Sequence, residues 1–174
     1  MDIYDAINKR TSIRKYKPDA VSDDKLNRIL DAARRAPSGK NGQPWRFIVV
    51  RDKKIKQDLI LACRNQAFIA EAPVIIIGCA VEAESYQKQG GYMKSWSIDL
   101  GLAFEHLMLT AVAEGLGSCW IGAFDEVEVR KVLNIPNQFR IVGLAPLGVP
   151  AESPAPKPRK PLNEIVSYDK APDK

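Results

Sequence analysis

Basic side chains gather near both ends of this 174-residue chain and are its best candidates for binding chemistry. The clusters are Lys9, Arg10, Arg14, Lys15 and Lys17, and then Lys157, Arg159 and Lys160. Guanidinium and ammonium groups bind phosphate through charge-assisted hydrogen bonds, so clusters that met in space would favour a phosphorylated ligand. The net charge is only +5, however, and separate solvated surfaces explain the same pattern. A shared anion site therefore needs support from a further motif.

Side chains for acid–base or metal chemistry are scarce. His106 is the only histidine, and its apolar surroundings predict a packed, hydrogen-bonded residue rather than a base or a metal ligand. Cys63, Cys79 and Cys119 are far apart in apolar segments, which argues against a disulfide or a metal site. An enzyme with so few acid–base groups would rely on a cofactor for its chemistry.

Glycine-rich nucleotide-binding motifs do not match either. The segment GLGSCWIG from Gly115 has Trp120 where a dinucleotide-binding loop needs its third glycine, and it follows a helix instead of joining a strand to one. The sequence contains no GxxxxGK[ST] loop. Neither a Rossmann site nor a P-loop is therefore expected.

Apolar periodicity and turn residues predict alternating helices and strands. One helix runs from Ser22 to Arg35, with Ser22 as its N-cap and Pro37 after its end. The polar segment from Glu82 to Lys94 contains two adjacent glycines, which predicts a mobile loop. The other expected helices are Asp2–Lys9, Lys53–Cys63, Ser95–Glu114 and Glu126–Leu133, and the expected strands are Trp45–Val50, Val74–Ala80, Cys119–Ile121 and Phe139–Val149.

The helix expected over Ser95–Glu114 is apolar on nearly all sides. Such a helix is buried on more than one side, and a chain of this length can hardly surround it alone. A central core helix and a subunit interface both explain the pattern. We expect this helix to serve as both.

The chain is expected to be one domain over residues 1–150 with a Pro-rich arm over residues 151–174. The stretch PAESPAPKPRKP from Pro150 holds five of the twelve prolines, which favours an extended, polyproline-like backbone. Pro158 and Pro161 also form a PxxP spacing that could bind an SH3 domain, although this spacing is common by chance.

Targeting and membrane segments are not evident. The longest apolar stretch, Pro73–Val81, is shorter than the roughly 20 residues that cross a bilayer, and the first residues lack the pattern of a signal peptide. A soluble protein of the reducing cytoplasm is expected, with no membrane partner.

Four segments in this order resemble motifs of the FMN-dependent nitroreductase family. They are KRTSIRKY from Lys9, APSGKNGQPWRF from Ala36, GLGSCWIGAFD from Gly115 and KPRKPLNEIV from Lys157, and the resemblance spans about residues 3–166. It implies an α+β fold in which helices flank a central, mainly antiparallel sheet. It also implies an intertwined homodimer with an extended C-terminal arm and FMN at the interface.

The resemblance assigns a role to each segment. Arg10, Lys157 and Arg159 would bind the FMN phosphate, Thr11 and Ser12 the phosphate and ribityl chain, and Arg14 the pyrimidine edge. A cation at that edge stabilises the reduced ring and raises its reduction potential. Pro37, Ser38, Gly39 and Asn41 would reach the flavin bound chiefly by the other subunit, where small residues let backbone approach a flat ring. Ile121, Gly122 and Ala123 would bring a backbone N–H to flavin N5, so no catalytic side chain is assigned.

A ping-pong reaction follows from one open pocket. NADH or NADPH would deliver hydride to N5 and leave, and a small, planar, electron-poor acceptor such as a quinone or nitroaromatic would then take its place. Candidates for the pocket wall are Tyr86, Tyr92 and Phe124, and Phe68 and Trp96 are further aromatic residues near these segments.

Two other functional hypotheses stay open. The first is a reductive dehalogenase or another specialised flavin enzyme of the same fold, against which the short 82–94 loop argues mildly. The second is a basic binding module for nucleic acid, but the chain lacks the aromatic and basic interleaving or the cysteine spacing of common nucleic-acid modules. No nucleic-acid partner is therefore expected.

Overall fold

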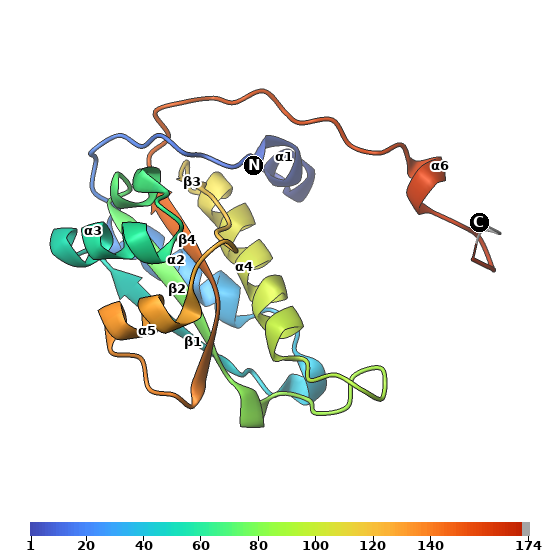
Figure 1. Cartoon of the computed structure of the whole chain (residues 1–174). Coiled ribbons are helices and arrows are strands. Elements are labelled where there is room, and N and C mark those ends of the chain that lie inside the picture. Colours follow the sequence, from blue (N-terminus) through green and yellow to red (C-terminus); the bar gives the residue numbers. More distant parts are fainter. Residues whose placement is uncertain (172–174) are drawn as a thin grey trace.

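A four-stranded antiparallel sheet with the strand order β1-β2-β4-β3 forms the centre of the fold (Figure 1). The computed structural model describes residues 1–171. The strands are β1 (Trp45–Val50), β2 (Val74–Val81), β3 (Gly117–Ser118) and β4 (Phe139–Gly148). β2 begins with a β-branched run and is buried along nearly its whole length, as a strand paired on both edges and covered on both faces must be.

Six α-helices accompany the sheet within residues 1–171. They are α1 (Ile3–Lys9), α2 (Asp23–Arg34), α3 (Lys53–Ala62), α4 (Trp96–Ala113), α5 (Glu126–Leu133) and the short α6 (Leu162–Ile165). Ser22 caps α2 as expected, because its hydroxyl accepts a hydrogen bond from the backbone N–H of Lys25. The predicted helices of the first 150 residues are all present with small shifts at their ends.

Helices cover both faces of the sheet. Alternate side chains of β2 point to opposite sides, so Ile76 packs in a cluster with residues of α2 and α4, whereas Ile75 and Ile77 pack in a cluster with residues of α3 and α5. Trp45 at the start of β1 is buried in the first cluster. The α+β architecture with an antiparallel sheet flanked by helices is therefore confirmed.

α4 is the central core helix, but only on one side. Leu100, Phe104 and Leu107 are fully buried against the sheet and α2. On the opposite side Ile98 and Leu102 are 37% and 41% exposed. Within one chain this helix is therefore not buried all round, and its cover by a second subunit stays a prediction.

The strand expected at Cys119–Ile121 was wrong in its position. β3 is Gly117–Ser118, and Ile121 makes only an isolated bridge to Leu144 of β4. Between them the ring of Trp120 lies against Gly143, where an added Cβ would be 2.4 Å from the ring. The bulky indole therefore lies between the two sites of pairing with β4, which are β3 and the bridge at Ile121. Apolar composition alone does not reveal this interruption.

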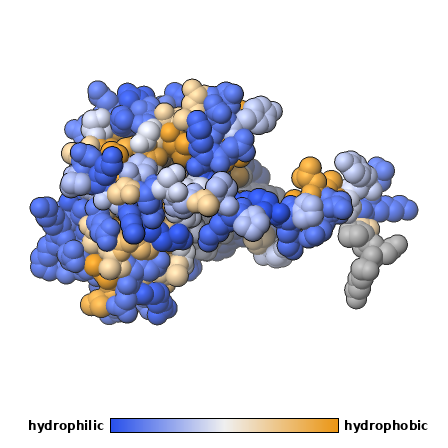
Figure 2. All heavy atoms as spheres, turned by 90° about the horizontal axis from the view of Figure 1, so that it is seen from above, coloured by the Kyte–Doolittle hydropathy of each residue, from blue (hydrophilic) through white to orange (hydrophobic). Residues whose placement is uncertain are grey.

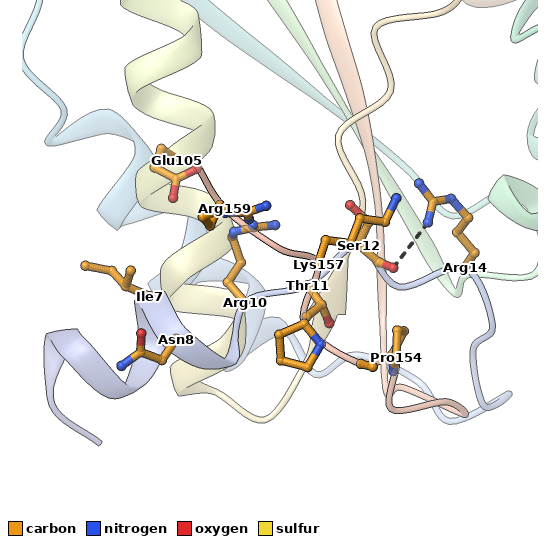
Figure 3. Close-up of a pocket in the computed structure, with 12 residues that line it drawn as sticks. Ile7, Asn8, Arg10, Thr11, Ser12, Arg14, Glu105, Pro154, Lys157 and Arg159 are labelled. Carbon is orange, nitrogen blue, oxygen red and sulfur yellow. Dashed lines mark hydrogen bonds between the residues drawn. The ribbon is translucent and has the colours of Figure 1, made fainter. Parts of the chain in front are cut away.

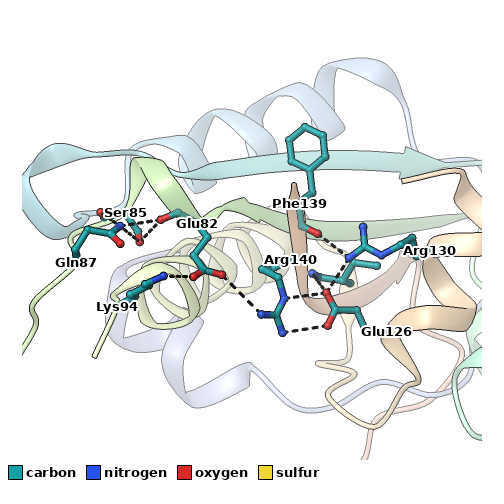
Figure 4. Close-up of polar contacts among 9 residues, drawn as sticks. Glu82, Ser85, Gln87, Lys94, Glu126, Arg130, Phe139 and Arg140 are labelled. Atoms are coloured by element: carbon teal, nitrogen blue, oxygen red, sulfur yellow. Dashed lines mark hydrogen bonds and ion pairs between the residues drawn. The ribbon is translucent and has the colours of Figure 1, made fainter. Parts of the chain in front are cut away.

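The loop from Glu82 to Lys94 contains ordered turns, and its predicted mobility stays a prediction. It begins with a 3₁₀ turn over Glu82–Glu84, and an ion pair between Glu82 and Lys94 links its two ends (Figure 4). Arg140 of β4 bridges this pair to Glu126 of α5. Burial opposes ionisation of Glu126, yet hydrogen bonds from Arg140 and the Ile141 N–H hold its pKa below the ordinary value. The base of the loop is thus attached to the sheet.

The chain projects from the body after Pro150. Residues 151–161 form no helix or strand and run past α1 before α6 (Figure 1). Figure 2 shows this projection with apolar side chains near its end, where Leu162 and Ile165 of α6 are exposed. The division into a domain and an arm stays a prediction, and its last part, residues 172–174, lies outside the described residues.

The three cysteines, Cys63, Cys79 and Cys119, are free and buried. His106 is half-buried, with Nδ1 3.2 Å from the carbonyl oxygen of Ala32, as a packed, hydrogen-bonded histidine requires. Over residues 1–171 no group of acidic, cysteine and histidine side chains could hold a metal ion. In the same range no helix is long and apolar enough to span a bilayer.

The buried thiols are expected to resist alkylation in the native protein. Burial raises the pKa of Cys63 and of Cys79 to about 11, so at pH 8 only about one such thiol in a thousand is ionised. Reaction with a disulfide dye should be slow without denaturant and rapid in urea, and raising the pH toward 11 should speed it. Rapid labelling of the folded protein at pH 8 would contradict this burial.

Candidate functional site

A cavity of about 510 Å³ lies where the two ends of the chain meet. Its walls are the end of α1, the segment after α1, the segment after Pro150 and one side chain of α4 (Figure 3). Its lining includes six of the residues predicted to bind the cofactor, namely Arg10, Thr11, Ser12, Arg14, Lys157 and Arg159. The two basic clusters therefore converge on one cavity.

Backbone pairing brings these distant segments together. The N–H of Ile13 donates to the carbonyl of Ser118 at 2.9 Å, which attaches the segment after α1 to β3. The N–H of Ala151 donates to the carbonyl of Lys15 at 2.9 Å, and the N–H of Arg14 donates to the Glu152 carboxylate at 2.6 Å. These contacts fix the start of the C-terminal segment beside residues 11–17.

The charges of the cavity suit an anion. Arg10 and Arg159 lie next to each other in Figure 3, and Lys157 completes the cationic set. Among the described residues none of these three side chains forms an ion pair within the chain, whereas ten other basic residues do. Their positive charge is therefore available to a ligand.

Glu105 of α4 also lines the cavity, and the sequence analysis did not select it. Its carboxylate lies on the same side of the cavity as Arg10 and Arg159 (Figure 3). The only signal in the sequence was a polar residue within an apolar helix. The negative charge of Glu105 opposes an anion in the cavity electrostatically.

Arg14 is placed differently from the other cations. Its guanidinium donates to the carbonyl of Ser12 at 3.5 Å and lies 5.9 Å from the centroid of the Phe68 ring. It is exposed and lines the cavity apart from Arg10 and Arg159 (Figure 3).

The loop of residues 37–44 does not line this cavity. Its residues Gly39 and Gly42 line a second hollow of about 400 Å³, whose other walls are residues 84–88. The Ser38 hydroxyl accepts a hydrogen bond from the N–H of Gln43, and Asn41 has a left-handed φ of 55°. Pro37 and Asn41 are exposed. One chain therefore does not bring these four predicted residues to the cavity of Arg10.

Packing within the chain, and not only the approach of a flat ring, explains the glycines of this loop. A Cβ on Gly39 would lie 2.6 Å from Cβ of Tyr86, and a Cβ on Gly42 would lie 2.3 Å from the carbonyl oxygen of Glu84. The loop is therefore packed against residues 84–86 of its own chain. This contact alone requires that residues 39 and 42 have no side chain, whether or not a ring lies on the other side of the loop.

The segment after β3 offers backbone donors at the surface. Ile121 is buried and exchanges two backbone hydrogen bonds with Leu144, at 2.8 and 3.1 Å. Gly122 and Ala123 are exposed, and in the described part of the chain neither N–H donates a hydrogen bond. These two groups are therefore free to donate to a ligand.

The aromatic candidates separate into two groups. Phe68, Trp96 and Phe124 pack against the two core clusters and are partly buried. Tyr86 lines the second hollow, and Tyr92 is 84% exposed on the loop. Tyr86 is thus the aromatic residue that the structure places at a hollow.

Comparison with known proteins agrees with these motifs. A family model described as the nitroreductase family matches residues 7–67 and 60–149. A protein of Thermus thermophilus named NADH dehydrogenase is 35% identical, over 97% of this chain and 96% of its own. Iodotyrosine deiodinase of Thermotoga neapolitana is 28% identical, over 94% and 95%. The crystal structure of a nitroreductase family protein of Clostridium novyi covers 90% of this chain and 89% of its own, with 41% identity and a TM-score of 0.82.

Proposed function

Because the chain belongs to the nitroreductase family, we propose that it is an FMN-dependent NAD(P)H oxidoreductase that binds the FMN phosphate in the cavity of Arg10, Lys157 and Arg159. The observation that carries the proposal is the convergence of these cations, unpaired within the described chain, from opposite ends of the sequence. A phosphate monoester carries nearly two negative charges and accepts several charge-assisted hydrogen bonds. The donor set fits such a group.

The remaining residues would hold the flavin and exclude side reactions. Thr11 and Ser12 are half-buried beside the cavity and would donate to the phosphate and the ribityl chain. Arg14 would place its charge at the pyrimidine edge, and the free N–H groups of Gly122 and Ala123 would donate to N5. FMN, when bound, supplies the group that accepts and returns hydride. No side chain of this chain is needed as a proton donor, because water can serve.

The proposed enzyme is a homodimer, since one chain does not complete the site. Pro37, Ser38, Gly39 and Asn41 line or border a separate hollow, so they would contact a flavin held chiefly by a second copy. The exposed apolar surface formed by Ile98 and Leu102 of α4 and by Ile3, Tyr4 and Ile7 of α1 would be buried between the copies. The two helices that carry these residues, α1 and α4, are in contact.

The reaction would be ping-pong, with both substrates using one open pocket in turn. NADH or NADPH enters first, and a small, planar, electron-poor acceptor such as a quinone or nitroaromatic follows. Tyr86, Tyr92 and Phe124 are proposed for the pocket wall, of which Tyr86 already borders a hollow. The protein is proposed to act in the cytoplasm without a nucleic-acid or membrane partner.

Anaerobic addition of NADH or NADPH is expected to bleach a yellow protein, and a quinone is expected to restore the colour. The physical reason is the pair of free N–H groups at Gly122 and Ala123, which would orient N5 for hydride transfer. Absorbance is followed in a sealed cuvette, with dithionite as the control that every bound flavin can be reduced. A flavin that dithionite bleaches and neither nicotinamide reduces would overturn the proposed donor.

A second candidate is reductive dehalogenation, which the likeness to iodotyrosine deiodinase favours. Such an enzyme needs a lid that closes on a zwitterionic substrate, whereas residues 82–94 form a short loop whose ends are joined by the pair of Glu82 and Lys94. Release of iodide from iodotyrosine by the reduced protein, measured beside quinone and nitroaromatic reduction, separates the two candidates. Quinone reduction without iodide release supports the first.

A further inference from the structure

Two loops meet at the first turn of α4 through one buried carboxylate. The backbone N–H of Gly39 donates to Oδ1 of Asp99 at 3.0 Å, and the Ser95 hydroxyl donates to Oδ2 of Asp99 at 2.6 Å. The same hydroxyl oxygen accepts the backbone N–H of Tyr86 at 3.0 Å. Asp99 and Ser95 are 2% and 1% exposed. The loop of residues 37–44 is thus linked to residues 82–88 through the pair of Asp99 and Ser95.

Further contacts make the two loops one unit. The N–H of Val81 donates to the carbonyl of Pro44 at 2.8 Å, and Arg46 pairs with Glu84 at 2.8 Å. The ammonium group of Lys40 lies 4.9 Å from the centroid of the Tyr86 ring. The close approach of Gly39 and Gly42 to residues 84–86 leaves little room for one loop to shift without the other. Displacing either loop would therefore displace its neighbour.

Asp99 links this unit to the first turn of α4. A carboxylate accepts from an N–H and an O–H at the same time, which an apolar residue cannot do and an amide does only in part. Its place in the first turn of α4 favours a negative charge, because the unpaired N–H groups of a helix N-terminus carry partial positive charge. Without the carboxylate, the Gly39 N–H and the Ser95 hydroxyl would be buried without these partners.

We propose that Asp99 is a positioning residue that fixes the loop of residues 37–44 and Tyr86 together as one wall of the acceptor pocket. The proposal rests on the proposed function, in which residues 37–41 contact the flavin of the second subunit. The buried pair of Asp99 and Ser95 would then fix the positions of two groups. These are the loop that orients the ring and the tyrosine that borders the acceptor. Acceptor binding would depend on Asp99, although Asp99 touches neither substrate nor flavin.

Hydrogen–deuterium exchange of the full-length protein tests this link directly. In Asp99→Ala, amides in peptides covering residues 37–44 and 82–88 are expected to exchange about tenfold faster or more. The first loop loses the acceptor of the Gly39 N–H, and the Ser95 hydroxyl that accepts from the Tyr86 N–H loses the carboxylate that orients it. In Asp99→Asn the amide oxygen can still accept from Gly39, so protection of residues 37–44 is expected to return. Glu114→Ala is the matched control, because it removes a carboxylate from the other end of α4, where Glu114 pairs with Arg28.

Kinetics of the flavin-loaded protein give the second readout. Asp99→Ala is expected to raise KM for a quinone about tenfold while affinity for FMN falls less, because the cavity of Arg10 and Arg159 is untouched. Unchanged exchange in both loops of a folded Asp99→Ala protein, or an unchanged KM, would overturn the proposal. If Asp99→Ala does not fold, exchange in Ser95→Ala tests the proposal instead. Amides of residues 82–88 are then expected to exchange faster, and unchanged exchange there would overturn the proposal. If the protein binds no FMN, the proposed function is wrong, and the exchange experiment still tests the link between the two loops.

Discussion

Arg159→Ala is expected to weaken FMN binding by about ten- to a hundredfold. A charge-assisted hydrogen bond contributes about 1.5–3 kcal/mol, and this range corresponds to that loss of affinity. Arg159 and Arg10 line the same cavity and have no acidic partner in the described chain, so a phosphate would be their main counter-charge. The Kd is measured by quenching of free FMN fluorescence when flavin-depleted protein is added.

Two variants control this prediction. Arg51→Ala removes an arginine that pairs with Asp23 away from the cavity, and it should leave the Kd unchanged. Glu105→Gln removes the negative charge that lines the cavity, and it should tighten FMN binding slightly. Because the side chain of Arg159 is exposed, added salt should weaken binding to the unchanged protein. An Arg159→Ala protein that holds FMN as tightly as its parent would show that the phosphate lies elsewhere.

Leu102→Glu is expected to convert the protein to a monomer and to release its FMN. Leu102 lies on the exposed apolar surface of α1 and α4, so in the proposed dimer its replacement would bury an unpaired carboxylate. An uncompensated buried charge costs about 3–5 kcal/mol, which weakens association by more than about a hundredfold. FMN would be lost as well, because residues 37–41 of the second copy would no longer reach the ring.

The matched control is Leu61→Glu. Leu61 is an exposed leucine of α3, which packs on the other face of the sheet from α4, so the same substitution there should change neither mass nor flavin content. Light scattering after size exclusion gives the mass, and absorbance gives the flavin content. A Leu102→Glu protein that stays dimeric would place the subunit interface away from α4.

The sequence predicted those elements whose signals are local. The β-branched run of β2 and the capping serine of α2 each depend on neighbouring residues, and both are present as expected. β3 was misplaced because two paired residues at a sheet edge have no pattern of their own. Their position depends on pairing with Leu147 and Gly148 of β4, which is a contact between distant segments.

The candidate site was predictable in parts. Family motifs indicated Arg10, Lys157 and Arg159, and the structure brings these residues to one cavity. Spacing alone favoured separate solvated surfaces over convergence, since folding decides which distant segments meet. Asp99 was visible only as a carboxylate within an apolar helix, and its partner Gly39 lies 60 residues away. Local patterns cannot show such a pairing, so its role emerged only from the fold.

Native mass spectrometry of the purified protein tests the central claim most directly, because it counts chains and flavins in one measurement. If two copies hold FMN between them by the basic residues of their termini, the main species will contain two chains and two FMN molecules. A main species of one chain without flavin, from cells supplied with riboflavin, would contradict the account.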